Sequence, residues 1–257
     1  MPIKIKLKNF KMTKFIAEIG LNAMGSEKIG FELVKKVSKI KPWGISFQIA
    51  EDNYYDNTKP WKKKLSLRFY KRVKIFLKKR NIKFGIGIYD TKAIDFVQKY
   101  KIDFWKIIST KFYNDSLIKK ALQTKKPVFL STGFASMKEI KKKSLKFKKV
   151  NFVHTALDKK ITQNLNAINS IKKETKRSEI AYGLHADDHN VVLMAIALQA
   201  NPIFFYVRLD DKRKYPDHEH AIIIKDLKKK INYWRKSRET LSDGKKNNLK
   251  IPKWVLE

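Results

Sequence analysis

The sequence predicts an α/β protein, a (β/α)8 TIM barrel that forms a single domain, and three observations support this. Short runs rich in β-branched and aromatic residues alternate with Lys-rich amphipathic segments along the whole chain. This alternation is typical of βα units around a parallel sheet. Eight such pairs fit within 257 residues, which is the length expected for this barrel. No Pro-, Gly- or Ser-rich linker interrupts the alternation.

The elements follow one another in a regular order. The expected strands are 15–20, 43–50, 84–89, 104–109, 127–132, 150–155, 179–185 and 203–209. The expected helices are 26–40, 65–80, 91–100, 115–122, 136–147, 164–174, 190–200 and 222–239. Several helical segments begin at Ser, Thr, Asp or Asn, the residue types that cap helix N-termini. We therefore assign residues 1–240 to the barrel and 241–257 to a short tail that packs on the outside or caps one end.

Composition narrows the functional classes. The chain has no cysteine, which fits a reducing compartment, and no run of about 18 uncharged residues that could cross a membrane. We therefore expect a cytoplasmic protein. The net charge of +35 would suit a polyanion partner, yet only eight of the 59 basic residues are Arg and the Lys residues are spread along the chain. Specific nucleic-acid readers use Arg forks in a local stripe, so we interpret the lysines as solvated helix faces, with attraction of anionic metabolites as an alternative.

Polar residues mark the ends of the expected strands, where a barrel of this class places its chemistry. Glu18 lies inside the apolar run FIAEIG, and a charge there costs several kcal/mol unless it is compensated. We expect Glu18 to lie near the barrel mouth, where a ligand or a cation pairs with it. The other candidates at strand ends and in the loops that follow are Asn22, Gln48, Tyr89, Asp90, Lys106, Ser109, Ser131, Thr132, Gly133, His154, His185, Asp217 and His218.

Several motifs resemble one known family. FIAEIGLNAMGS at 15–26 resembles the F-I-A-E-I-G-x-N-H-x-G pattern that opens the sialic acid synthases, the N-acetylneuraminate and related nonulosonate synthases. The likeness continues in order through residues 15–225, with matching segments at 46–48, 87–109, 126–140, 182–200 and 215–222. The resemblance implies a (β/α)8 barrel. It also implies a small antifreeze-like domain after the barrel, and we expect this chain to lack that domain.

The resemblance also implies a chemistry. Phosphoenolpyruvate condenses with the aldehyde of an open-chain N-acetylhexosamine, water adds, and phosphate leaves to give a nine-carbon 2-keto acid sugar. A divalent metal, Mn²⁺ or Mg²⁺, polarises the aldehyde. By position, the resemblance assigns catalytic roles to Glu18 and Lys106, substrate binding to Asn22, Gln48, Ser109, Ser131 and Asp217, and a metal ligand to His185.

Four positions depart from the family pattern. Ser46 replaces a Lys that binds phosphoenolpyruvate, and Ala23 replaces a His. Tyr206 stands at the second metal-binding His, and Lys111 stands where an acidic residue is usual. The Tyr-Pro pair that normally follows strand six is also missing.

These departures leave two interpretations open. In the first, the protein is a divergent synthase in which Lys111 partly replaces the lost Lys, and His154, His218 or water completes the metal shell. In the second, the barrel binds a sugar or phosphometabolite without catalysing the reaction. A basic nucleic-acid-associated protein is a less favoured third interpretation. The family's antifreeze-like domain completes a neighbour's site, so either a homodimer or a separate chain is expected to complete this one.

Overall fold

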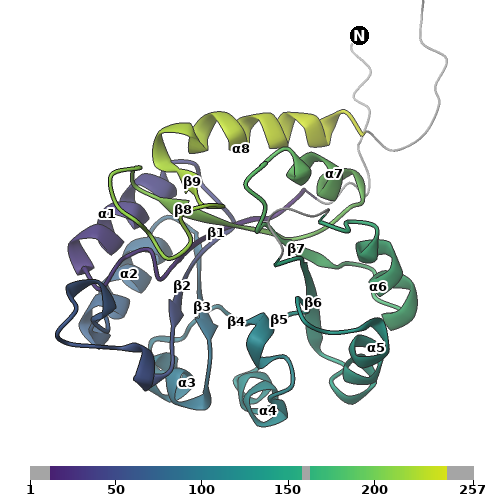
Figure 1. The fold of residues 1–257 in the computed structure, drawn as a ribbon, viewed down its shortest axis with the longest axis horizontal. Helices are drawn as coiled ribbons and strands as arrows, with labels where there is room; N and C mark the ends of the chain where they lie inside the picture. The colour runs from purple at the N-terminus through teal and green to yellow at the C-terminus, as the bar shows by residue number, and fades with distance from the viewer. Residues whose placement is uncertain (1–11, 158–162, 242–257) are drawn as a thin grey trace, which may run out of the picture.

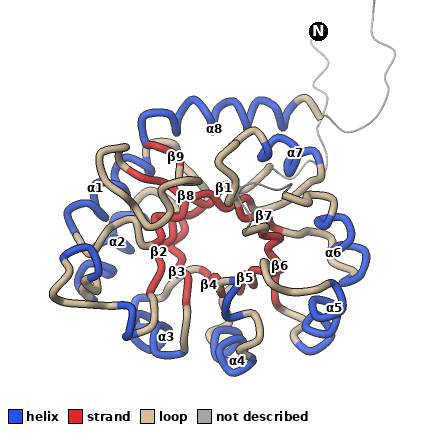
Figure 2. The backbone as a smooth tube through the Cα atoms, in the orientation of Figure 1, coloured by secondary structure: helices blue, strands red, loops and turns tan. Residues whose placement is uncertain are grey.

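The computed structural model describes residues 12–157 and 163–241. Within them the strands form a closed ring surrounded by helices (Figure 1, Figure 2). The (β/α)8 barrel expected from the sequence is therefore confirmed. The expected tail at 241–257 lies outside the described residues, apart from Leu241.

The observed elements follow the predicted order. The strands are β1 Phe15–Gly20, β2 Gly44–Ile49, β3 Lys83–Ile88, β4 Phe104–Ile107, β5 Val128–Ser131, β6 Val150–Thr155, β7 Ala181–Gly183, β8 Ile203–Arg208 and β9 Ile222–Ile223. The α-helices are α1 Glu27–Ser38, α2 Leu67–Lys78, α3 Thr91–Val97, α4 Asp115–Gln123, α5 Met137–Lys146, α6 Ala167–Thr175, α7 Val191–Ala197 and α8 Ile224–Glu239. Four short 3-10 helices, which the sequence did not reveal, are η1 Asp52–Tyr54, η2 Pro60–Lys62, η3 Gln98–Tyr100 and η4 Ser109–Lys111.

Parallel pairing between β1 and β8 closes the barrel. Glu18 of β1 lies beside Tyr206 of β8 on one side and beside Ser46 of β2 on the other. This register brings three positions of interest from sequence-distant segments next to one another. One expectation was wrong in detail: Ile222 and Ile223 were assigned to the last helix, but they pair with β8 as β9.

Large aromatic side chains form a plug in the barrel interior, near the N-terminal ends of the strands. The rings of Phe104, Phe129 and Phe204 contact one another with centroids 5.2–6.5 Å apart. They come from β4, β5 and β8, so they meet through the interior of the ring. Phe104 takes its space from the neighbouring strands: a Cβ on Gly85 would lie 2.0 Å from its ring.

Side chains of the opposite parity face the helices. Phe47 of β2, for example, packs against Phe69 and Tyr70 of α2. Because successive strand residues point to opposite faces, the Phe layer fixes which residues face the interior. The residues two positions after this layer also face the interior. They are Glu18 on β1, Lys106 on β4, Ser131 on β5 and Tyr206 on β8.

The outer surface fits the interpretation of the lysines as solvated helix faces. On α5, Ile140 is buried while Lys138, Lys141 and Lys142 are exposed. No helix among the described residues combines the length and the apolar character that a bilayer span requires.

Candidate active site

The pairing partner of Glu18 is Lys106. The Lys106 ammonium on β4 donates a hydrogen bond to Oε2 of Glu18 on β1, across the barrel. Both residues are almost fully buried, with exposures of 2% for Lys106 and 1% for Glu18. The Ser46 hydroxyl makes a longer hydrogen bond, 3.5 Å, to Oε1 of the same carboxylate. Glu18 is thus compensated by a cation of the protein itself, and this buried pair forms the floor of the mouth.

Lys106 has a second set of contacts. Its ammonium lies 4.8 Å from the ring centroid of Phe204 and 5.6 Å from that of Tyr206. A cation over an aromatic face is stabilised by the ring quadrupole. These rings hold the Lys106 nitrogen at the boundary between the aromatic plug and the polar mouth.

A chain of hydrogen bonds crosses the mouth above Glu18. The Tyr89 hydroxyl donates to Oε1 of Gln48 at 3.2 Å, and Nε2 of Gln48 donates to the Tyr206 hydroxyl oxygen at 2.7 Å. Burial raises the pKa of Tyr206 well above its ordinary value, and the negative charge of Glu18 adds to this shift. Burial raises the pKa of Tyr89 in the same way. Both phenols therefore stay protonated at neutral pH; the Tyr89 hydroxyl donates to Gln48, and the Tyr206 hydroxyl accepts from it.

Gly20 provides the space for this chain. A Cβ at Gly20 would lie 2.9 Å from Cε1 of Tyr206 and 3.2 Å from Oδ2 of Asp217, and the φ of +58° favours glycine. The Tyr206 ring on β8 therefore leans over the end of β1 to reach Gln48 on β2. A pocket beside this point is lined by Gly20, Gln48, Tyr54 and Tyr55, among others.

Asn22 follows β1 as expected, and both ends of its side-chain amide have partners within the protein. Its Nδ2 donates to the Val207 carbonyl at 2.9 Å, and its Oδ1 accepts from the backbone N–H of Asp217 at 3.1 Å. The side chain is fully buried. Both ends of the amide therefore hold the protein together, and Asn22 positions Asp217 where we had expected a substrate contact from Asn22 itself.

Ser109 and Ser131 follow β4 and end β5, on the side of the mouth next to Lys106. The Ser109 hydroxyl accepts a hydrogen bond from the Gly133 backbone N–H at 3.2 Å. Ser131 is 2% exposed, and its hydroxyl has no hydrogen-bond partner among the described residues. A Cβ on Gly133 would lie 2.7 Å from the Ser109 hydroxyl oxygen. These groups form a compact set of hydroxyl and amide groups suited to an anion.

The expected metal ligand, His185, lies among rings. Its imidazole centroid is 4.6 Å from that of His220 and 5.4 Å from the Tyr206 ring. His220 also lies 3.7 Å from Oδ1 of Asp217. Across the described part of the chain, however, no group of three or more His, Asp or Glu side chains has the arrangement to hold a metal ion. The described residues thus offer no set of three such ligands, and the expected metal stays a prediction.

The two histidines expected to complete a metal shell have other partners. Nε2 of His154 donates to the Gln163 carbonyl at 2.9 Å, and its ring stacks on Tyr182. His154 has the parity of the helix-facing residues of β6, so its neighbour Thr155 faces the interior. Burial lowers the pKa of His154. Nδ1 of His218 lies 3.1 Å from the Arg213 carbonyl.

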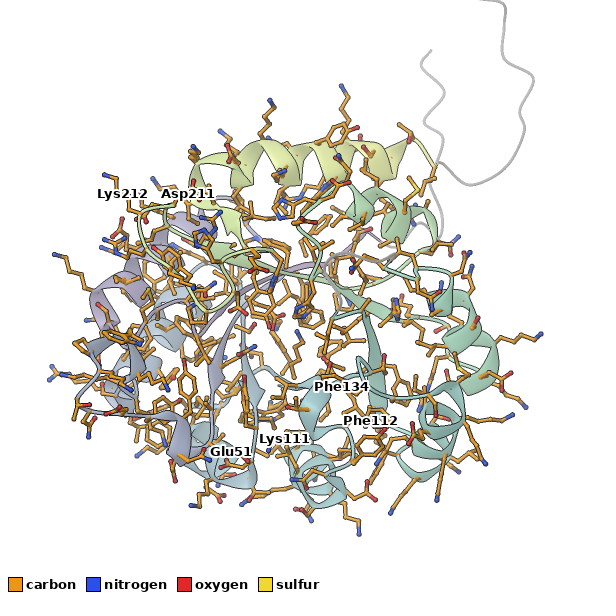
Figure 3. The ribbon with its side chains drawn as sticks, in the orientation of Figure 1. Glu51, Lys111, Phe112, Phe134, Asp211 and Lys212 are labelled. Atoms are coloured by element: carbon orange, nitrogen blue, oxygen red, sulfur yellow. The ribbon has the colours of Figure 1, made fainter. Side chains whose placement is uncertain are left out.

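Lys111 lies at the rim of the mouth. Its ammonium pairs with Oε1 of Glu51 at 2.6 Å, and the two side chains meet in Figure 3. The expectation that Lys111 replaces the cation lost at Ser46 therefore has to include Glu51, which neutralises Lys111 in this structure.

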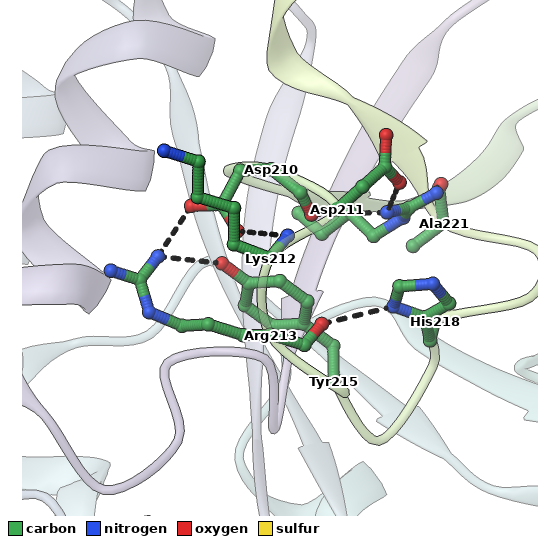
Figure 4. Close-up of polar contacts among 8 residues, drawn as sticks. Asp210, Asp211, Lys212, Arg213, Tyr215, His218 and Ala221 are labelled. Carbon is green, nitrogen blue, oxygen red and sulfur yellow. Dashed lines mark hydrogen bonds and ion pairs between the residues drawn. The ribbon is translucent and has the colours of Figure 1, made fainter.

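The loop between β8 and β9 is braced by its own polar contacts (Figure 4). Arg208 donates to the Ala221 carbonyl at 3.1 Å and pairs with Asp211. Arg213 pairs with Asp210 and donates to the Tyr215 hydroxyl at 3.3 Å. This bracing gives Asp217 and His220 a defined position at the mouth.

Sequence reasoning recognised Tyr206 and Ser46 only as departures and missed His220. Strand parity could have placed Tyr206 inside the barrel, because it lies two residues after Phe204. His220 lies in an irregular loop, where no periodicity indicates the direction of a side chain.

The fold and the site define a class: a (β/α)8 barrel with a buried Lys–Glu pair and an anion-sized set of hydroxyls at the C-terminal ends of its strands. Residues 30–246 match the NeuB family. The chain belongs to this family, and the resemblance seen in the sequence is confirmed.

The chain is also similar to individual nonulosonate synthases. This chain is 25% identical to the N,N'-diacetyllegionaminic acid synthase of Campylobacter jejuni, over 93% of this chain and 80% of the relative. The pseudaminic acid synthase of the same species is 23% identical over 94% of this chain and 79% of its own length. The crystal structure of N-acetylneuraminic acid synthetase from Leptospira borgpetersenii has the same fold, with a TM-score of 0.82 and 24% identity over 95% of this chain and 92% of that one.

Proposed function

We propose that this protein condenses phosphoenolpyruvate with the aldehyde of an open-chain N-acetylhexosamine to form a nonulosonic acid. In this reaction C3 of phosphoenolpyruvate bonds to the aldehyde carbon, whose oxygen takes a proton. Water adds to C2, and the bond from C2 to the phosphate oxygen breaks. The products are a 2-keto acid sugar and inorganic phosphate. Membership of the NeuB family supports a reaction of this class, since the named relatives are nonulosonate synthases.

The single observation that carries the proposal is the buried Lys106–Glu18 pair at the barrel mouth. A buried ion pair is weak evidence for stability, because desolvation offsets much of its attraction. A preorganised binding site explains a buried pair at this place better than a contribution to stability does. Lys106 supplies the positive charge for the carboxylate and phosphate of phosphoenolpyruvate, and Glu18 supplies an acceptor for the sugar.

The two sides of the mouth suit the two substrates. The hydroxyls of Ser109 and Ser131 lie beside Lys106 and provide hydrogen bonds for the phosphate, and the Gly133 N–H holds the Ser109 oxygen in place. Glu18, Gln48 and Asp217 lie towards β1 and β8 and provide the polar groups for the sugar. In this assignment the aldehyde carbon meets C3 of phosphoenolpyruvate above the Glu18 carboxylate, between the two sets.

A second candidate is a barrel of the same family that binds a sugar or phosphometabolite without turning it over. The observation that favours it is the replacement of a cation by Ser46 and of an imidazole by Tyr206, both at the mouth. The two candidates share a pocket and differ only in chemistry.

The experiment that separates them measures inorganic phosphate release from phosphoenolpyruvate. The acceptors are N-acetylmannosamine and a panel of related amino sugars, each tested with Mn²⁺, with Mg²⁺ and with EDTA. The synthase requires release that depends on the sugar and is lost in Lys106→Ala and Glu18→Ala. Silence across the panel, with phosphoenolpyruvate or sugar still binding by calorimetry, would support the binding barrel.

A further inference from the structure

We propose that Tyr206 is the electrophile of this site: its hydroxyl donates a hydrogen bond to the aldehyde oxygen and takes the place of a divalent metal ion. This inference rests on the proposed function. It starts from a disagreement, because the described residues form no group of three metal ligands and a phenol stands where a second imidazole was expected.

The position of the hydroxyl is the first argument. Tyr206 is beside Glu18 in the β1–β8 register and faces the interior. Its ring leans over Gly20, whose missing Cβ leaves the necessary space. The phenol is longer than an imidazole, so its oxygen reaches Gln48 on β2, the next strand but one.

The direction of the hydrogen bonds is the second argument. Tyr89 donates to the carbonyl oxygen of Gln48, and the amide nitrogen of Gln48 donates to the Tyr206 oxygen. In the described part of the chain, this is the one hydrogen bond of the Tyr206 hydroxyl, and the hydroxyl accepts in it. The Tyr206 proton is therefore left to donate to a ligand, and the bond from Gln48 polarises the O–H in the direction that strengthens this donation.

The surroundings are the third argument. Tyr206 is 4% exposed, so little water competes for its proton. His185 and His220 pack against its ring, with centroids 5.4 Å and 4.9 Å away, and hold it in place. A fixed donor in a dry site stabilises developing negative charge without reorganisation. As C3 of phosphoenolpyruvate attacks, the carbonyl electron pair moves to the aldehyde oxygen, and the Tyr206 hydrogen bond stabilises that charge until the oxygen is protonated.

The test compares phosphate release by EDTA-treated wild type, Tyr206→Phe and Tyr89→Phe. We expect EDTA-treated wild type to keep its rate and to gain nothing from added Mn²⁺. Tyr206→Phe keeps the ring and loses the donor, so its kcat should fall about 10²- to 10³-fold, the effect of removing one oxyanion donor, with the KM for the sugar unchanged. Tyr89→Phe is the matched control. It removes a hydroxyl from the same chain of hydrogen bonds, but this hydroxyl donates to Gln48 and not to the aldehyde oxygen, so we expect kcat to change by less than about tenfold.

A second readout does not depend on turnover. Calorimetric titration of the wild-type protein with Mn²⁺ should give no saturable binding in the absence of substrates. Stoichiometric Mn²⁺ binding, a wild-type rate that EDTA abolishes and Mn²⁺ restores, or a Tyr206→Phe variant as active as wild type would overturn the assignment and leave the proposed function intact. A wild-type protein that releases no phosphate with any sugar, with or without metal, would refute the proposed function and this inference with it.

Discussion

Lys106 on β4 and Glu18 on β1 form an ion pair through the interior of the barrel, and both side chains are nearly inaccessible to water. Residues 88 positions apart in the sequence thus share one charge-neutral unit. The consequences of this pair and of its neighbours can be measured.

Removing one partner of the pair should destabilise the fold. Lys106→Met leaves Glu18 buried without its cation, and we expect the free energy of unfolding to fall by about 3–5 kcal/mol. The double variant Lys106→Met/Glu18→Gln removes both charges and should recover much of that loss. Urea denaturation measures all three proteins. Lys92→Met breaks an exposed pair with Asp52 and is the control, with little expected change. If Lys106→Met behaved like this control, the pair would not be buried as described.

Asn22 should behave as a structural residue. Asn22→Ala leaves the Val207 carbonyl and the Asp217 N–H without their partner, and such buried groups cost about 1–3 kcal/mol. We expect a lower unfolding midpoint. We also expect a loss of sugar affinity that arises only through misplacement of Asp217, so Asp217→Asn should reduce sugar affinity without lowering the midpoint as far. A variant Asn22→Ala with native stability and no sugar binding would restore the direct contact first expected for Asn22.

The folded protein should lose stability in mild acid because His154 is buried. Its pKa is lowered in the folded protein by burial, so below the ordinary value of about 6.5 the unfolded chain takes up a proton that the folded one resists. The stabilisation is therefore complete above about pH 6.5 and is lost as the pH falls towards the folded pKa.

Unfolding by urea between pH 7.5 and 5 measures this effect, with His154→Gln as the variant that cannot titrate. We expect the variant to lose less stability over this range than the wild type. Burial also lowers the pKa of His189, so some acid sensitivity remains in the variant. Identical pH profiles would show that His154 does not contribute.

Gly133 predicts a specific defect in anion binding. A Cβ there would lie 2.7 Å from the Ser109 hydroxyl oxygen and 2.9 Å from Cδ1 of Leu157. Gly133→Ala should therefore displace Ser109 and raise the KM for phosphoenolpyruvate by about tenfold, the effect of about 1.4 kcal/mol in binding. Gly183→Ala is the matched control at the same mouth, since its Cβ would meet the Thr155 hydroxyl at a milder 3.1 Å. Equal KM values for the two variants would refute the role of Ser109 and Gly133 in binding the anion.

Most of the fold was predictable because local patterns carry it. The run FIAEIG at 15–20 coincides with β1, and the caps Ser26 and Ser136 start their helices as expected. Short or irregular segments were missed: β9 has two residues, too few to show a period, and was read as the start of a helix. The positions of Glu18 and Lys106 at the ends of strands also followed from the sequence, because strand order in a barrel brings such ends together.

The sequence by itself determined the alternation of strands and helices, the family resemblance and the need of Glu18 for a partner, since periodicity and local charge are properties of neighbouring residues. Only the tertiary structure decided which cation pairs with Glu18, that Asn22 braces the loop before Asp217, and that His220 lies beside His185 where His154 does not. Strand parity and barrel closure fix these contacts, and closure joins residues from opposite ends of the chain that no local pattern connects. Tyr206 shows both sides: its identity was evident in the sequence, and its reach over Gly20 to Gln48 required the closed barrel.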